Sequence, residues 1–104
     1  MENKNKSNVL DIVKTLVEQI SKNYSVESVY LYGSCSYGSP GNESDIDVAV
    51  ILNEFIDNAK DFDIFRIGQK IDLDLEVVAF TNDDFVSDAS DLIVEIKTKG
   101  EKVA

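Results

Sequence analysis

Two carboxylates stand at the start of an otherwise apolar segment of the chain. Asp45 and Asp47 flank Ile46, and the residues from Val48 to Leu52 are all apolar. Oxygen donors with no nitrogen or sulfur ligand beside them suit Mg²⁺ or Mn²⁺ better than zinc. The chain contains no histidine, so the usual proton shuttle and the usual zinc ligand are both missing. We therefore interpret the two aspartates as a candidate site for a divalent cation.

A loop rich in glycine and serine precedes these aspartates. Gly33 and Ser34 directly follow an apolar segment that ends at Tyr32, and residues 33–44 are typical of a loop. Glycine permits close backbone approach, and a loop of this kind can direct backbone amides at phosphate oxygens. The loop is therefore a candidate phosphate neighbour of the two aspartates.

A second acidic segment follows later in the chain. Side chains alternate across a strand, so a predicted strand over residues 71–80 places Asp72, Asp74 and Glu76 on one face. If this strand lies beside the one that begins near Asp47, up to five carboxylates converge. Like charges at such short separation destabilise a sheet unless solvent or cations screen them. The alternative is an acidic, solvated sheet surface that binds no metal.

The elements that must position these residues alternate along the chain. Apolar spacing predicts helices over residues 9–20, 54–70 and 90–99, and strands over 26–32, 46–52 and 71–80. Residues 81–84 are typical of a turn or helix cap, and residues 101–104 of a short edge strand. Period two assigns Ile46 and Val48 to the face of their strand that must form the core. The pattern predicts a single α/β (α+β) domain over residues 1–104, with helices packed on a sheet.

Composition limits the function classes. The 20 acidic and 10 basic residues give a formal charge of −10, which argues against a broad nucleic-acid surface. A nucleotide held through divalent cations remains compatible with that charge. No segment has the length and apolar character of a membrane span, and residues 1–8 lack the apolar core of a signal peptide. The single cysteine, Cys35, agrees with a reducing compartment, so we expect a cytoplasmic protein.

Gly33-Ser34, ten further residues and then Asp45-Ile46-Asp47 together resemble the GS-x10-DxD signature of the DNA polymerase β-like nucleotidyltransferases. Within that superfamily the chain is most similar to the minimal nucleotidyltransferases (MNT), over nearly its whole length. The resemblance implies a polymerase β-like fold, a mixed sheet packed against helices. It also implies that Gly33 and Ser34 hold the triphosphate of ATP or another NTP, and that Asp45 and Asp47 bind Mg²⁺ or Mn²⁺.

The resemblance also requires a third carboxylate on a neighbouring strand, as metal ligand and base. Glu76 is preferred because it lies nine residues before Phe85, as in related chains, with Asp74 and then Asp72 as the alternatives. The implied reaction transfers a nucleoside monophosphate, AMP for preference, to a hydroxyl acceptor. For an MNT-type antitoxin that acceptor lies on a HEPN-type partner protein. Exposed strand edges also predict a homo- or hetero-oligomer.

One departure from the family supports a rival hypothesis. Many relatives carry arginines directly after the Gly-Ser pair, where this chain has Cys35, Ser36 and Tyr37. Loss of those basic groups favours a catalytically degenerate binding module or an antitoxin that acts by protein–protein contact alone.

Overall fold

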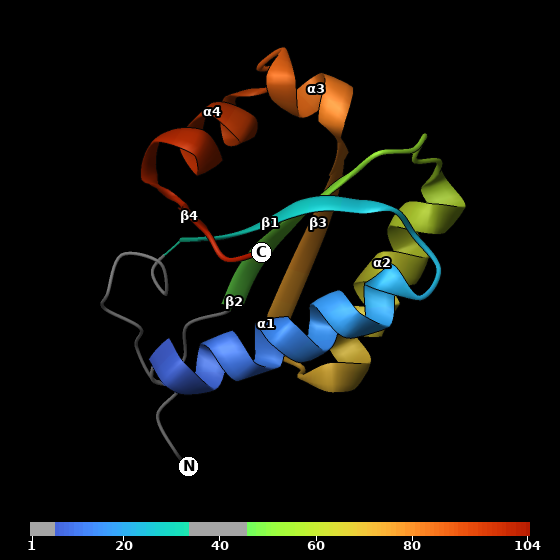
Figure 1. Cartoon of the computed structure of the whole chain (residues 1–104), viewed down its shortest axis with the longest axis vertical. Helices are drawn as coiled ribbons and strands as arrows, with labels where there is room; N and C mark the ends of the chain where they lie inside the picture. Colours follow the sequence, from blue (N-terminus) through green and yellow to red (C-terminus); the bar gives the residue numbers. More distant parts are fainter. Residues whose placement is uncertain (1–5, 34–45) are drawn as a thin grey trace.

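The computed structural model describes residues 6–33 and 46–104, which form a mixed four-stranded sheet with helices on both faces (Figure 1). The elements in chain order are α1 (Lys6–Ser21), β1 (Val26–Tyr32), β2 (Ile46–Leu52), α2 (Asn58–Ile71), β3 (Leu75–Thr81), α3 (Asn82–Val86), α4 (Asp91–Lys99) and β4 (Glu101–Lys102). The strand order is β3-β2-β1-β4, with β1 antiparallel to β2 and β4 and with β2 parallel to β3. The predicted α+β class and mixed sheet are confirmed.

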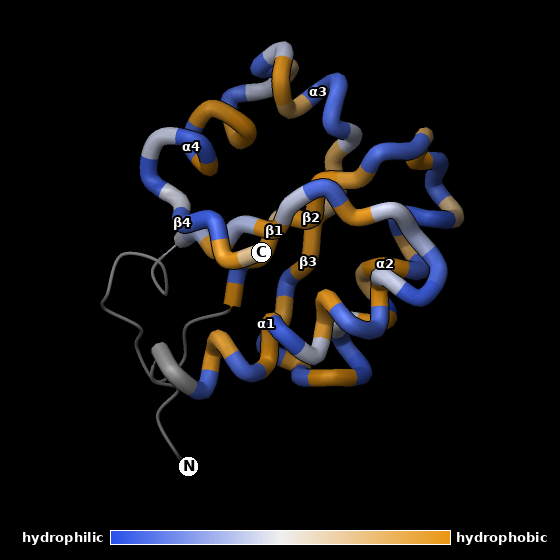
Figure 2. Tube along the Cα trace, viewed as in Figure 1, coloured by the Kyte–Doolittle hydropathy of each residue, from blue (hydrophilic) through white to orange (hydrophobic). Residues whose placement is uncertain are grey.

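The central strands β1 and β2 begin and end where the sequence predicts. Both faces of β2 are buried, however, whereas the sequence assigned the core to one face alone. Ile46 and Val48 pack with α1 and α2, and Ala49 and Ile51 pack with α3 and α4 on the opposite face. The hydrophobic colouring along most of β2 reflects this double burial (Figure 2). Strands covered on both faces carry apolar runs rather than strict alternation.

Helix α2 begins at Asn58, four residues later than the sequence predicts. The Asp57 side chain caps it by accepting a 2.8 Å hydrogen bond from the Lys60 backbone N–H. Glu54 precedes the cap and accepts hydrogen bonds from the Ser25 backbone N–H and the Lys60 ammonium, at 2.7 and 2.9 Å. These two donors hold the pKa of Glu54 below its usual value. These hydrogen bonds hold Glu54 against the residue that precedes β1, so the segment before Asn58 does not join the helix.

Strand β3 begins at Leu75, so the predicted strand start at residue 71 is wrong. Ile71 still belongs to α2, and Asp72 is the extended residue that ends the helix. The Asp74 backbone N–H donates to Asp72 Oδ1 at 2.8 Å, which closes a tight turn before the strand. The prediction that Asp72, Asp74 and Glu76 share one strand face is therefore also wrong, because only Glu76 lies in β3.

The carboxyl-terminal third follows the sequence prediction closely. Thr81 caps α3 by accepting from the Asp84 backbone N–H, Ser90 caps α4, and the Gly100 N–H closes the end of α4 on the Ile96 carbonyl. Residues Glu101–Lys102 then form the short edge strand β4. Among the described helices, none has both the length and the apolar character required to cross a bilayer.

Close packing between α2 and β3 generates a stability prediction. A Cβ at Gly68 would stand 2.6 Å from Val77 Cγ2, in a buried contact. Overpacking costs about 1–3 kcal/mol, against about 1 kcal/mol gained by replacing a helical glycine. We expect Gly68→Ala to lower the free energy of unfolding by roughly 1 kcal/mol, measured by urea denaturation.

Val77→Ala is the matched partner for this test, because it removes the methyl group that a Cβ at position 68 would meet. The double variant should lose less stability than the sum of the two single variants. A Gly68→Ala protein as stable as the wild type would contradict the close contact.

Candidate active site

Three side chains form a row across the sheet at the end where β2 and β3 begin. In the backbone register, Tyr32 of β1 stands opposite Asp47 of β2, and Asp47 stands opposite Glu76 of β3. Directly paired residues project from the same face of a sheet and lie close together. The register therefore brings the predicted pair Asp47 and Glu76 side by side, with Tyr32 on the other flank of Asp47. We call these three residues the carboxylate row.

The row changes from buried to exposed along its length. Tyr32 is only 8% exposed, Asp47 is half-buried and Glu76 is exposed. Burial raises the pKa of Tyr32 to about 12, and the negative charges of Asp47, Glu76 and Glu95 contribute to this rise in that order. The tyrosine hydroxyl therefore stays protonated and neutral at physiological pH, beside carboxylates that repel any further negative charge.

Glu95 is a further charged residue near the carboxylate row, and the sequence did not predict its place there. It lies on α4 between the buried residues Ile93 and Ile96, and its charge acts on Tyr32 through space. Helical periodicity distinguishes the buried positions of α4 from the exposed ones, and by that criterion Glu95 is an ordinary exposed residue. Only the packing of α4 over the sheet brings its charge toward the carboxylate row.

Gly33 is adapted to its place beside Asp47 in two ways. Its φ of +75° lies in the left-handed region that favours glycine. A Cβ at this position would also overlap Asp47 Oδ2. The backbone of Gly33 therefore lies directly against the Asp47 carboxylate.

Several predicted site residues lie outside the described residues. These are Ser34, Asp45 and the segment 35–37 that replaces the family's arginines. In the part of the chain that is described, no group of three or more Asp, Glu, His or Cys side chains is arranged to hold a metal ion. Asp47 and Glu76 nevertheless stand side by side in the register, and their oxygen donors are of the kind that Mg²⁺ and Mn²⁺ prefer.

Asp72 and Asp74 are placed differently from Glu76. Both belong to the turn before β3, and the Asp74 carbonyl accepts a 2.8 Å hydrogen bond from the Ile46 backbone N–H. Asp74 thus contributes its backbone to the start of the β2–β3 pairing. Of the three acids considered as the third carboxylate, Glu76 alone has a strand register opposite Asp47.

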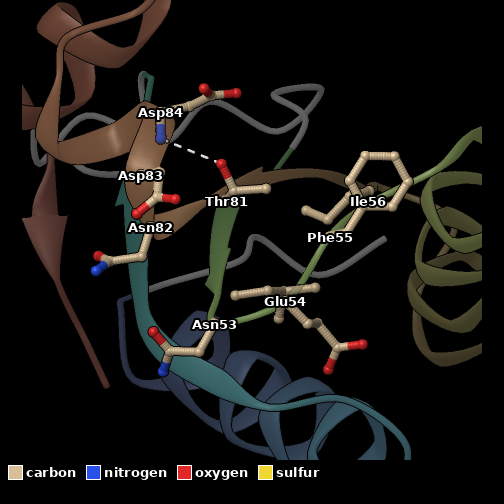
Figure 3. A pocket seen from close by; sticks show the side chains of 9 residues that line it. Asn53, Glu54, Phe55, Ile56, Thr81, Asn82, Asp83 and Asp84 are labelled. Atoms are coloured by element: carbon tan, nitrogen blue, oxygen red, sulfur yellow. Dashed lines mark hydrogen bonds between the residues drawn. The ribbon is translucent and has the colours of Figure 1, made fainter.

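A cavity of about 510 Å³ lies at the other end of the same strands (Figure 3). It is lined by Leu52–Ile56 after β2 and by Thr81–Asp84 after β3. Leu52 lies five positions after Asp47 in the strand, or about 17 Å away at the usual rise. The cavity is therefore a different surface from the carboxylate row.

Comparison with protein families shows one match that covers most of the chain. The family model described as polymerase beta, nucleotidyltransferase matches residues 14–103. The protein adenylyltransferase MntA of Shewanella oneidensis is 29% identical over 93 residues, which make up 88% of this chain and 61% of that protein. The chain thus spans less than two thirds of that relative's length.

Solved structures show the same fold. A chain of a toxin–antitoxin crystal structure with AMP-PNP superposes with a TM-score of 0.65 at 21% identity, covering 91% of this chain and 72% of its own. A chain from a complex of a tri-AMPylated HEPN toxin with an MNT antitoxin, from Shewanella oneidensis, gives 0.59 at 18% identity. That match covers 95% of this chain and 71% of the other.

The contact between Gly33 and Asp47 can be tested directly. We expect Gly33→Ala to lower the free energy of unfolding by about 1–2 kcal/mol for the left-handed backbone alone, and more because Cβ displaces the Asp47 carboxylate. Asp47→Ala removes the overlap but leaves the backbone conformation. Chemical denaturation of the two single variants and the double variant should therefore show that the Gly33→Ala cost shrinks when residue 47 is alanine. An unchanged cost would place the Asp47 carboxylate away from Gly33.

Proposed function

This chain belongs to the polymerase beta nucleotidyltransferase family, and we propose that it transfers AMP from ATP to a hydroxyl group. The observation that carries the proposal is the register that sets Asp47 beside Glu76, with Gly33 against the Asp47 carboxylate. An oxygen-only pair next to a glycine-led loop suits a triphosphate held through divalent cations. At such a site the negative charges of the protein carboxylates and of the nucleotide lie close together.

Each residue has a distinct role in the proposal. Asp45, Asp47 and Glu76 hold Mg²⁺ or Mn²⁺, and Gly33 and Ser34 present backbone amides and a hydroxyl to the phosphates. The bound cations supply charge neutralisation for the triphosphate and activation of the attacking hydroxyl. Tyr32 stays neutral and closes the buried end of the carboxylate row, so that no further negative charge is added there.

The transfer is an in-line substitution at the α-phosphorus of ATP. The acceptor oxygen forms the new bond to phosphorus while the bond to pyrophosphate breaks. Glu76 takes the proton of the acceptor hydroxyl, since it is the exposed member of the carboxylate row and therefore accessible to an incoming partner. The protein contributes positioning and electrostatic stabilisation rather than a covalent intermediate.

A protein hydroxyl is the acceptor that we favour. The curated relative is named a protein adenylyltransferase, and one structural neighbour is an MNT antitoxin in complex with a tri-AMPylated HEPN toxin. These names support a HEPN-type partner and an antitoxin role for this chain. The second candidate, an antitoxin that acts by contact without transfer, is supported by Cys35, Ser36 and Tyr37 in place of the family's arginines.

Label transfer separates the two candidates. The chain is incubated with α-labelled ATP, Mg²⁺ and the protein encoded beside it, and label on that protein is quantified. We expect Asp47→Asn and Glu76→Gln each to lower the rate by about 100-fold or more, because each removes charge stabilisation at the transferred group. The control Asp11→Asn removes one carboxylate from an exposed position on α1 and should keep the wild-type rate.

If Asp47→Asn labels the partner protein at the wild-type rate, the assignment of the carboxylate row as the active site is wrong. If the wild type labels nothing but binds Mg²⁺ and ATP together in calorimetric titration, contact without transfer is the better account. Circular dichroism melting of each variant verifies that the fold is intact.

A further inference from the structure

A continuous groove crosses the carboxyl ends of β2 and β3, away from the carboxylate row. The cavity of about 510 Å³ already described adjoins a second of about 200 Å³, and the two share Ile56, Thr81 and Asp84. The second cavity extends the first along Ala79 and Phe80 of β3 to the start of α2. We call this continuous depression the edge groove.

The edge groove exposes the rim of the sheet. Strand β3 is an outer strand, because β2 is its one neighbour in the described sheet. The Asp74 carbonyl points to β2, so alternation turns the backbone groups of Leu75, Ala79 and Thr81 outward. The Gln69 side chain covers the first of these by donating to the Leu75 carbonyl at 2.6 Å. Ala79 and Thr81, further along this edge, line the second cavity.

Sequence features that protect exposed strand edges are missing from this strand. Natural edge strands commonly carry lysine, proline or a bulge that prevents another chain from pairing. The segment LEVVAFT has neither lysine nor proline, and its pairing with β2 is regular from end to end. An extended segment can therefore add to β3 at the edge groove by backbone hydrogen bonds.

Charge determines which kind of segment fits. The residues that line the edge groove include five carboxylates and neither lysine nor arginine: Glu54, Asp57, Asp61, Asp83 and Asp84. Lys60 pairs with Glu54 and Asp57 caps α2, so the charge offered to a partner comes chiefly from the other three. A second copy of this chain would bring the same acids against one another, which is unfavourable. A basic segment meets the opposite sign instead, and complementary charge also steers its approach.

The groove also offers an apolar anchor. Phe55 is 76% exposed, and it lies with Ile56 on one side of the depression. Figure 3 places Thr81 between this apolar pair and the acidic segment that contains Asp83 and Asp84. Side chains of an extended segment alternate in direction. One set can therefore meet the acids while the other meets the phenylalanine.

We propose that the edge groove docks an extended segment of a partner protein in which basic and apolar residues alternate. The segment adds to the edge of β3 at residues 79–81, sets its Lys or Arg side chains against the aspartates, and packs an apolar side chain on Phe55. This docking is independent of nucleotide transfer, because the edge groove and the carboxylate row lie at opposite ends of β2 and β3.

The test titrates the ¹⁵N-labelled full chain with the peptide acetyl-Lys-Val-Lys-Val-Lys-Val-amide. We expect amide shifts at residues 55–56 and 79–84 and little change at Asp47 and Glu76. The double variant Asp61→Asn/Asp84→Asn should bind about 3- to 10-fold more weakly, as expected for two exposed charge pairs. The control Asp11→Asn/Glu18→Gln makes the same change in charge at exposed positions on α1 and should bind like the wild type.

Two further probes keep the proposal falsifiable. Only alternate residues of the peptide donate to β3, so one peptide is N-methylated at the valines and another at the lysines; the one whose methyl groups face β3 should lose binding, and Phe55→Ser should weaken binding without altering the melting curve. Binding of both methylated peptides equal to that of the unmodified peptide would overturn strand addition. Equal weakening by both charge variants, shifts centred on Asp47, or no binding at all would overturn the docking site.

Discussion

Strands β2 and β3 run parallel with Asp47 opposite Glu76, while β1 runs antiparallel on the other side with Tyr32 opposite Asp47. The candidate site depends on this register of backbone hydrogen bonds. A slip of one residue in β2 would turn Asp47 toward the core formed with α1 and α2 and bring an apolar side chain to the site. The cost of burying the Asp47 carboxylate opposes such a slip, because the residues from Val48 to Leu52 are apolar and buried on both faces and do not by themselves distinguish the two registers.

Unequal covering of one sheet face explains why acids and apolar residues occupy the same side of β2. Helices α3 and α4 bury Ala49 and Ile51 at one end of that face, while Asp47 at the other end keeps partial contact with solvent. Tyr32 lies between the buried and the solvated part of this face. Its ring belongs to the core, and the charges of the carboxylates help to raise the pKa of its hydroxyl. Gly33 then leaves the Asp47 carboxylate unobstructed by any side chain of its own. This buried support fixes the position of Asp47 and Glu76, as the proposed cation site needs.

The sequence predicted those parts of the fold that depend on local pattern. Apolar runs bounded by polar residues predicted β1 and β2, and apolar spacing predicted α4, which begins one residue after the predicted start at Ser90. Residues 81–84 were predicted as a turn or helix cap, and Thr81 caps α3 there. Local alternation failed before β3, because a side-chain hydrogen bond to Asp72 converts an apparently continuous strand into a turn. For the site, spacing and family resemblance selected Asp47 and Glu76. The contribution of Glu95 arises from tertiary packing and leaves no periodic signal. Ser34 and Asp45 lie outside the described residues, so their roles stay predictions.

Paramagnetic broadening by Mn²⁺ tests most directly whether the carboxylate row is the cation site. The chain offers two competing acidic surfaces at opposite ends of the same strands, the carboxylate row and the edge groove with Asp83 and Asp84. With a non-hydrolysable ATP analogue present, substoichiometric Mn²⁺ should broaden the amide resonances of Gly33, Asp47 and Glu76 first and leave those of residues 82–84 sharp. Asp47→Asn should abolish that selectivity. Broadening that begins at residues 82–84, or that is uniform along the chain, would contradict the assignment of the carboxylate row as the catalytic centre.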